Sequence, residues 1–130
     1  MIAFWTVLAA AEDKERVAVE TTNMFAFGGV GIVGSLSPAE VAYHKIFRRP
    51  DSAAVFSAIL RNSSVTREGK LFALIGLRLR DPAAYRRVLP EFLRSEESVS
   101  TASGCIVFSR PVGQIVREVD NGLWDDRGEK

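Results

Sequence analysis

The sequence of 130 residues contains one cysteine and one histidine, and none of its apolar stretches is long enough to cross a lipid bilayer. Because Cys105 is alone, it cannot form an internal disulfide, which excludes a disulfide-stapled miniprotein but does not exclude export. His44 by itself cannot make a histidine-rich metal site. A membrane-spanning helix needs roughly 20 consecutive apolar residues, which no segment supplies. We therefore expect no metal centre and no membrane span.

Opposite charges nearly cancel over the whole chain. Seventeen basic and 16 acidic residues leave a formal net charge of +1, which predicts no particular affinity for nucleic acid or for an anionic membrane. The charge is unevenly distributed, because residues 1–36 carry −2, residues 37–95 carry +6 and residues 96–130 carry −3. The basic charge therefore lies in the middle of the chain, between two acidic flanks.

The composition is that of an ordinary folded domain, with 47% hydrophobic and 25% charged residues. A chain of this length buries roughly two-thirds of its unfolded surface, so it needs neither a disulfide nor a metal to fold. We expect one domain over residues 1–130, with a helical core over residues 37–95.

Helix signals dominate the middle of the chain. Residues 37–40, SPAE, are typical of a helix start with a capping box and a proline at the first helical position. Thr66 opens a helix that is apolar nearly all round, so we expect this helix to be the most buried element, packed around Phe72, Ile75 and Leu79. The expected helices cover residues 38–48, 51–62, 67–80, 82–94 and 111–121.

Two other segments have the patterning of extended chain. From Val17 to Gly34 apolar residues first alternate with others and four glycines then follow, which favours strand or loop over helix. Residues 98–102 and 105–108 are β-compatible runs around Ser103-Gly104, typical of a hairpin. The expected fold class is mainly α, with an extended glycine-rich N-terminal segment and a small β-hairpin near the C-terminus. The tail Asp125–Lys130 is expected to be solvated.

The helices expected over residues 37–62 and 66–94 form two pairs of similar length in tandem. The stretch LFALIGLRLRDPAAY, Leu71 to Tyr85, resembles segments of uncharacterised bacterial proteins with a short HEAT-like helical core. The resemblance covers about half the chain and implies short antiparallel helix pairs, each burying its apolar face against the next. It implies no catalytic residues and no particular function. Gly76, inside this stretch, predicts the close approach of a neighbouring backbone.

The N-terminal segment allows two interpretations. Ile2–Ala11 is apolar or small throughout and precedes a polar run, like the h-region and cleavage site of a signal peptide, although a basic n-region is missing. The alternative is an N-terminal strand or helix docked on the core. Residues 1–16 are thus signal-like or peripheral, and the expected location is periplasmic or secreted in the first case and cytoplasmic in the second.

The run Gly29–Gly34 matches the dinucleotide-binding pattern G-x-G-x-x-G, in which glycines let the backbone approach a pyrophosphate at a helix N-terminus. Asp51 would then be the acid that binds the ribose. However, the following helix starts three residues past the last glycine, and no second parallel strand follows to complete the unit. A structural glycine loop is the favoured interpretation, and a small-ligand or cofactor site at Gly28–Gly34 is the alternative. No cofactor is predicted.

Arginines of the basic block suggest a further alternative. Arg78, Arg80, Arg86 and Arg87 lie near expected helix ends, and clustered guanidinium groups bind phosphates or carboxylates. Such a cluster would make the protein a polyanion binder, whereas the simpler interpretation is a solvated face paired with nearby acids. The chain has no nucleic-acid-binding motif, which argues against nucleic acid as the partner.

Catalysis has little support in the sequence. A nucleophilic pair of Cys105 or a serine with His44 would need a convergence in space that sequence spacing does not indicate, and Cys105 is interpreted as a small buried hydrophobe. We therefore expect a non-enzymatic module that binds an unknown protein or peptide partner through a groove or its glycine-rich segment. The candidate partner-binding residues are Phe25, Phe27, Gly29, Gly31, Arg78, Arg80, Arg86 and Arg87.

Overall fold

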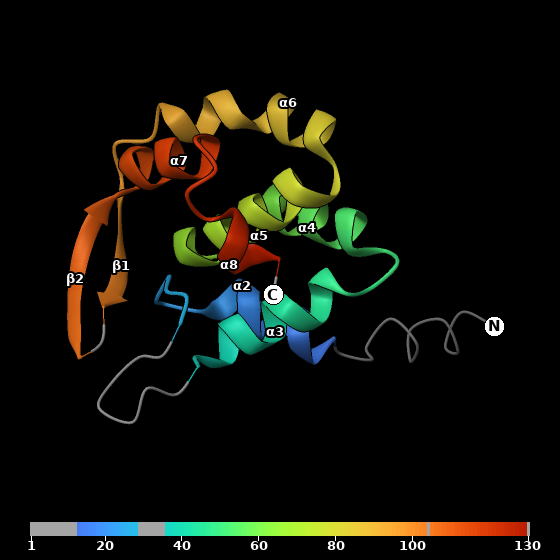
Figure 1. The fold of residues 1–130 in the computed structure, drawn as a ribbon, viewed down its shortest axis with the longest axis horizontal. Coiled ribbons are helices and arrows are strands. Elements are labelled where there is room, and N and C mark those ends of the chain that lie inside the picture. The colour runs from blue at the N-terminus through green and yellow to red at the C-terminus, as the bar shows by residue number, and fades with distance from the viewer. Residues whose placement is uncertain (1–12, 29–35, 104, 130) are drawn as a thin grey trace.

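A computed structural model of the chain describes residues 13–28, 36–103 and 105–129. The expected fold class is confirmed, since the described part is mainly helical with one antiparallel hairpin near the C-terminus (Figure 1). The signal-like segment Ile2–Ala11 and the G-x-G-x-x-G run Gly29–Gly34 lie outside the described residues. The elements are α2 (Lys14–Thr21), α3 (Pro38–Phe47), α4 (Ser52–Arg61), α5 (Arg67–Arg80), α6 (Pro82–Leu93), β1 (Ser98–Ser103), β2 (Ile106–Pro111), α7 (Val112–Asp120) and α8 (Asp125–Gly128).

Helix α5 is the centre of the fold, as its all-round apolar sequence predicts. The Thr66 hydroxyl caps its first turn by accepting from the Gly69 N–H at 3.1 Å. Phe72 and Ile75 are completely buried, whereas Leu79 is only partly buried and Leu77 takes its place in the core. Helices α6 and α7 lie on one side of α5, and α2 and α3 lie on the other (Figure 1). The chain remains helical through Arg80.

Two glycines of α5 allow neighbours to approach closely. A Cβ atom built on Gly69 would lie 2.2 Å from the backbone oxygen of Val19 in α2. A Cβ on Gly76 would lie 2.3 Å from the Phe56 ring of α4. The expectation for Gly76 was therefore right about close packing but wrong about the neighbour, which is a side chain and not a backbone.

Helix α2 replaces the strand that the alternation around Val17 predicted. The Asp13 carboxylate caps the helix by accepting from the Arg16 N–H, and Val19 is completely buried against the core. The Asp13 carboxylate also accepts hydrogen bonds from both terminal nitrogens of Arg49, one of them at 2.8 Å. This pair ties the start of α2 to the segment that follows α3. A side-chain cap and tertiary packing thus override a weak β pattern.

Helix α3 begins as predicted, with one difference in its cap. The Ser37 hydroxyl accepts from the Glu40 N–H at 3.1 Å, and Pro38 is the first helical residue. The Glu40 carboxylate does not turn back to the backbone of Ser37. It accepts instead from the N–H of Gly28 at 2.9 Å and is buried. Glu40, in the first turn of α3, is therefore hydrogen-bonded to Gly28, the first glycine of the glycine-rich segment.

The C-terminal third combines the hairpin, α7 and a returning tail. The apolar residues Val112, Ile115, Val116 and Val119 of α7 are all buried, and Gly122 has the positive φ of +80° typical after a helix end. Trp124 folds back onto the core, whereas Leu123 stays exposed. Pro90 does not divide α6, which continues to Leu93.

The C-terminal tail is only partly solvated: Asp126, Arg127 and Glu129 are exposed as expected, but Gly128 is buried against the fold. Asp125–Gly128 forms helix α8, and the Tyr43 hydroxyl donates to the Gly128 carbonyl at 2.9 Å. Arg78 of α5 binds the Asp125 carboxylate, with Nε 3.0 Å from Oδ1. Charged residues suggested solvation, but their partners lie on distant helices. Burial raises the pKa of the Tyr43 hydroxyl well above its ordinary range.

An aromatic cluster joins the segment after α2 and the segment after α7 to the central helix α5. Phe25 lies 5.0 Å, centroid to centroid, from both Phe72 and Trp124, and Phe27 lies 5.1 Å from Phe72. Tyr43 adds an edge contact to Phe27 at 5.4 Å. No helix in the described part of the chain is long and apolar enough to cross a membrane.

The central position of α5 predicts that replacing Ile75 by alanine lowers the free energy of unfolding by about 2–5 kcal/mol, because the lost methyl groups leave a cavity. Chemical denaturation monitored by circular dichroism measures this loss. The control V41A, at a half-exposed site of α3, should change stability by less than about 0.5 kcal/mol. A loss below about 1 kcal/mol for I75A would show that α5 is not the core.

The Asp13–Arg49 pair predicts a dependence of stability on pH. The hydrogen bonds from Arg49 lower the Asp13 pKa from 3.8 to about 2. A carboxyl group with a lowered folded-state pKa stabilises the fold above its unfolded pKa and loses this effect as the pH falls through its folded pKa. D13N should therefore be less stable than the wild type at neutral pH, with the difference shrinking between about pH 4 and pH 2.

Urea unfolding of both proteins across this pH range measures the difference. Without Arg49 the carboxylate has lost the partner that lowers its pKa. In an R49Q background the D13N difference should therefore depend on pH much less in this window, with the Arg16 N–H as the remaining donor to Asp13. A difference that stays constant down to pH 2 would contradict the role given to the pair.

Candidate functional site

The two long edges of the hairpin differ in their hydrogen bonding. On the outer edge of β1, the Ser98 carbonyl accepts from Arg67 at 3.0 Å. The Ser100 N–H donates to the Glu68 carboxylate at 3.0 Å, and the Ser100 carbonyl accepts from the Phe25 N–H at 2.8 Å. This edge is therefore closed by the start of α5 and by the segment after α2.

The outer edge of β2 is open with respect to residues 13–28, 36–103 and 105–129. Ser109 is the register partner of Ser100, and opposed residues of an antiparallel pair either bond to each other or both point outward. Because the backbone N–H and carbonyl of Ser100 point away from β2, those of Ser109 point away from β1. The backbone groups of Val107, two residues earlier, point in the same direction as those of Ser109. Neither has a backbone hydrogen bond to another segment in the described part of the chain. Figure 1 shows β2 as the outermost element on its side of the molecule.

Large apolar side chains lie along this open edge. The exposed fractions are 66% for Ile106, 59% for Val107 and 42% for Phe108, and these are consecutive residues. No charged side chain occurs from Ser98 to Ser109. Natural edge strands are usually protected from pairing by charge, proline or a covering element. The central part of β2, residues 106–109, has no such charge or proline.

The far end of β2 is anchored to the fold. Arg110 forms a two-point ion pair with Glu118 of α7, with Nη1 3.1 Å from Oε1, and the Trp124 indole N–H donates to the same carboxylate at 3.2 Å. The hydrogen bonds from Arg110 lower the Glu118 pKa. Val99 and Thr101 of β1 are buried. The open edge is thus carried on a strand pair that is fixed to the helices.

Of the aromatic candidates for partner binding, Phe25 is completely buried and Phe27 is partly buried in the aromatic cluster. Phe25 also forms an isolated parallel bridge with Thr101, so it connects the N-terminal segment to β1. Both rings therefore have packing roles. Gly29 and Gly31, the other candidates of this segment, lie outside the described residues.

The four candidate arginines differ in their contacts. Arg78 is bound to Asp125, which raises its pKa. The Arg80 guanidinium lies 3.8 Å from the centroid of the Phe47 ring and donates to the Phe47 carbonyl at 2.8 Å. Arg86 and Arg87 lie on the exposed face of α6, without an ion pair among the described residues. Two of the four side chains are therefore engaged in holding the fold.

A pocket of about 440 Å³ lies where the glycine-rich segment meets α3. Gly28 and Leu36, which flank the undescribed glycines, line it together with Glu40 and His44. The His44 Nε2 atom lies 3.4 Å from Glu40 Oε2, while its buried Nδ1 has no partner within the described structure. Two guanidinium groups, from Arg48 and Arg127, and the Phe27 ring complete the lining. This is the place where a ligand of the alternative, glycine-loop function would bind.

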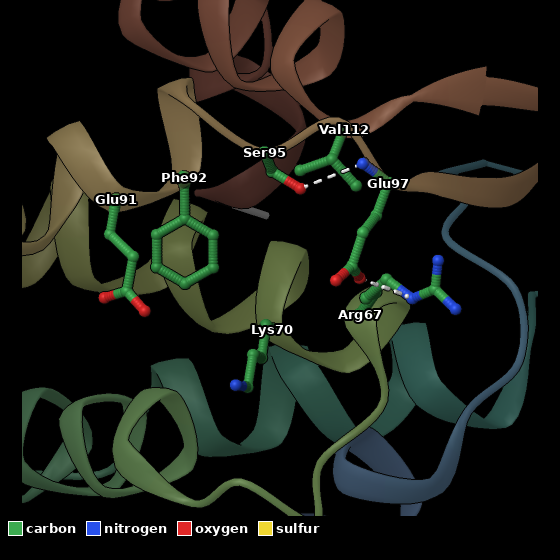
Figure 2. A pocket seen from close by; sticks show the side chains of 7 residues that line it. All are labelled: Arg67, Lys70, Glu91, Phe92, Ser95, Glu97 and Val112. Atoms are coloured by element: carbon green, nitrogen blue, oxygen red, sulfur yellow. Dashed lines mark hydrogen bonds and ion pairs between the residues drawn. The ribbon is translucent and has the colours of Figure 1, made fainter.

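A second pocket, of about 260 Å³, lies between the start of α5, the end of α6 and the base of the hairpin (Figure 2). Arg67 Nε lies 2.9 Å from the Glu97 carboxylate, and Ser95 Oγ accepts from the Glu97 N–H, so this wall is internally paired. Lys70 and Glu91 enter from other sides, and no ion pair joins them. The pocket has both signs of charge and no convergence of like groups that would select an ion.

The described residues contain neither Cys105 in the pocket of His44 nor a cluster of metal-binding side chains. Cys105 is exposed at the hairpin turn, which corrects the expectation of a buried thiol. It is absent from the pocket that His44 lines. No group of three or more metal-binding side chains occurs in the described part of the chain. Comparison of the chain with protein-family models, with curated proteins and with solved structures found no match in any of the three.

Sequence reasoning predicted the hairpin but did not identify its outer edge as a site. The signal was present as the uncharged run Ser98–Ser109 with three large apolar residues in succession. Strict alternation would have indicated a half-buried strand, whereas a continuous apolar run is equally consistent with full burial. Which edge is closed depends on Arg67, Glu68 and Phe25, all far away in sequence.

The pocket beside Gly28 gives a direct test of the cofactor alternative. If the glycine segment is structural, millimolar NAD or FAD should leave the melting temperature of the protein unchanged. A ligand at 100 times its dissociation constant would add about 2.7 kcal/mol of stability, which differential scanning fluorimetry detects readily. An upward shift that E40Q abolishes would instead support ligand binding at this pocket.

Proposed function

We propose that the protein is a non-enzymatic interaction module that binds an extended segment of a partner protein by strand addition along the outer edge of β2. The partner segment would pair with the outward backbone groups of Val107 and Ser109. This mode of recognition takes affinity from main-chain hydrogen bonds and specificity from side chains that alternate along the strand.

One observation carries the proposal. The same hairpin has one edge closed by three hydrogen bonds from other elements and one edge with none to any other described segment. On the closed edge, other elements of the same chain provide hydrogen-bonding partners for the backbone of β1. The open edge carries exposed apolar side chains, which favours an occupant that removes them from water.

The chemistry of the edge defines the partner segment. It should be extended, uncharged and apolar, because β2 presents Ile106, Val107 and Phe108 with no charge before Arg110. Arg110 is neutralised by Glu118, so it provides little attraction for an acidic ligand. Aromatic and β-branched cross-strand neighbours add about 0.2–1 kcal/mol each relative to alanine pairs.

A second candidate function is small-ligand binding at the pocket lined by Gly28, Glu40 and His44. The observation that favours it is the buried Glu40 carboxylate, which accepts from the Gly28 N–H and so holds one end of the glycine segment at the pocket. The polyanion alternative has less support, because Arg78 is hydrogen-bonded to Asp125 and Arg80 to the Phe47 carbonyl.

Replacing Val107 by proline should abolish strand addition without unfolding the protein. The Val107 N–H points outward, so its loss breaks no bond to β1, and proline is tolerated at such edge positions. A suitable probe is a fluorescent nine-residue peptide of alternating valine and threonine with a lysine at each end. We expect V107P to weaken its binding by about tenfold or more, because a backbone bond of about 0.5–1.5 kcal/mol is lost and the ring obstructs the edge.

The matched control is V107T, which keeps the N–H and a β-branched side chain and should bind the peptide nearly as well as the wild type. Fluorescence anisotropy gives both affinities, and circular dichroism verifies that each variant is folded. Equal binding of the peptide by V107P and wild type would refute strand addition at β2.

A further inference from the structure

We infer that the partner strand is β2 of a second copy of the same chain, so that two protomers join through an antiparallel β2–β2 contact about a twofold axis. This inference rests on the proposed function, since it names the occupant of the same edge. In the resulting dimer, β1 and β2 of each copy form half of a continuous four-stranded sheet.

The segment itself meets the description of the partner. Residues 106–109 are extended, uncharged and mostly apolar, and their outward backbone groups are open. Contact between two copies of one surface about a twofold axis makes an interface that is self-complementary and closed. Each protomer would therefore satisfy the open edge of the other and leave no new edge exposed at the contact.

One register pairs the exposed apolar residues only with each other. On β2 the residues whose backbone groups point outward are Val107, Ser109 and Pro111, because they alternate with those bonded to β1. Centring the contact on Val107 places it opposite the Val107 of the other copy and places Ile106 opposite Phe108 in both directions. Aromatic and β-branched pairs of this kind stabilise sheets. Moving the centre to Phe108 would place Ile106 opposite Arg110.

The charges permit this contact. Arg110 is the only charged residue of β2, and it is already paired with Glu118. In the register centred on Val107, the two Arg110 residues lie at opposite ends of the contact, about 20 Å apart at 3.3 Å per residue. This separation exceeds the screening length of about 8 Å at physiological salt. No like charges therefore face each other.

The size of the sheet favours pairing as well. A two-stranded sheet is marginal by itself, whereas three or more strands with an apolar face are stable. The described structure has a sheet of two strands only. A stable interface buries about 800 Å² on each partner, which a six-residue strand does not provide alone. The dimer should therefore be reversible and dependent on concentration.

A disulfide across the contact tests the inference. In the register centred on Val107, the Val107 residues of the two copies lie opposite each other at a hydrogen-bonded position, with Cα atoms about 5.5 Å apart, which suits a disulfide. The variant V107C, made together with C105S so that it carries a single thiol, keeps the backbone N–H and should therefore oxidise to a covalent dimer. The control A83C, also made with C105S, carries its thiol on the exposed face of α6, away from the contact.

We expect V107C/C105S to give a band of twice the monomer mass on a non-reducing gel, with A83C/C105S and C105S remaining monomeric. Sedimentation equilibrium of the wild type should show a mass that rises with concentration, and V107P should abolish this rise. A monomeric wild type at all concentrations, or V107C/C105S that crosslinks no faster than A83C/C105S, would overturn the inference. If the valine-threonine peptide still binds in a Val107-dependent manner in that case, strand addition stands and only the identity of the partner falls.

Discussion

The structure depends on a helix, α5, whose middle stretch Leu71–Leu77 has no polar side chain. From Leu71 to Leu77 every residue of α5 is buried, so this stretch is stable only if other elements cover it all round. Helices from both halves of the chain do so, and Gly69 and Gly76 let two of them approach more closely than a larger residue would permit. The arrangement of the remaining elements follows from this requirement, because each contributes one apolar face to the same central helix.

The segments far from α5 in sequence are tied to it by specific polar contacts. Asp125 binds Arg78, the Gly128 carbonyl accepts from Tyr43, and Asp13 binds Arg49. These contacts use charges that would otherwise suggest solvated tails and a basic face. As a result, Arg49 and Arg78 of the basic middle part of the chain are occupied in holding the fold, whereas Arg86 and Arg87 remain exposed on α6.

The outer edge of β2 carries exposed apolar side chains. The start of α5 and the segment around Phe25 close the edge of β1, so the hairpin is held to the body by one side only. Arg110 and Glu118 fix the other end of β2 without covering its backbone. A strand that is rigidly placed, uncharged and open can receive another strand with little ordering cost, which is why we regard strand addition as the function that the geometry supports best.

The sequence by itself determined the helical class, the hairpin, the central place of α5 and the helix starts at Ser37 and Thr66, because periodicity and capping are local properties. It did not determine that α2 is a helix, that the tail returns to the core or that Cys105 is exposed. Nor did it decide which hairpin edge is open. Those outcomes depend on pairs such as Ser100 with Phe25 and Arg78 with Asp125. Their partners are brought together only when burial of α5 folds the chain, so no local pattern contains them.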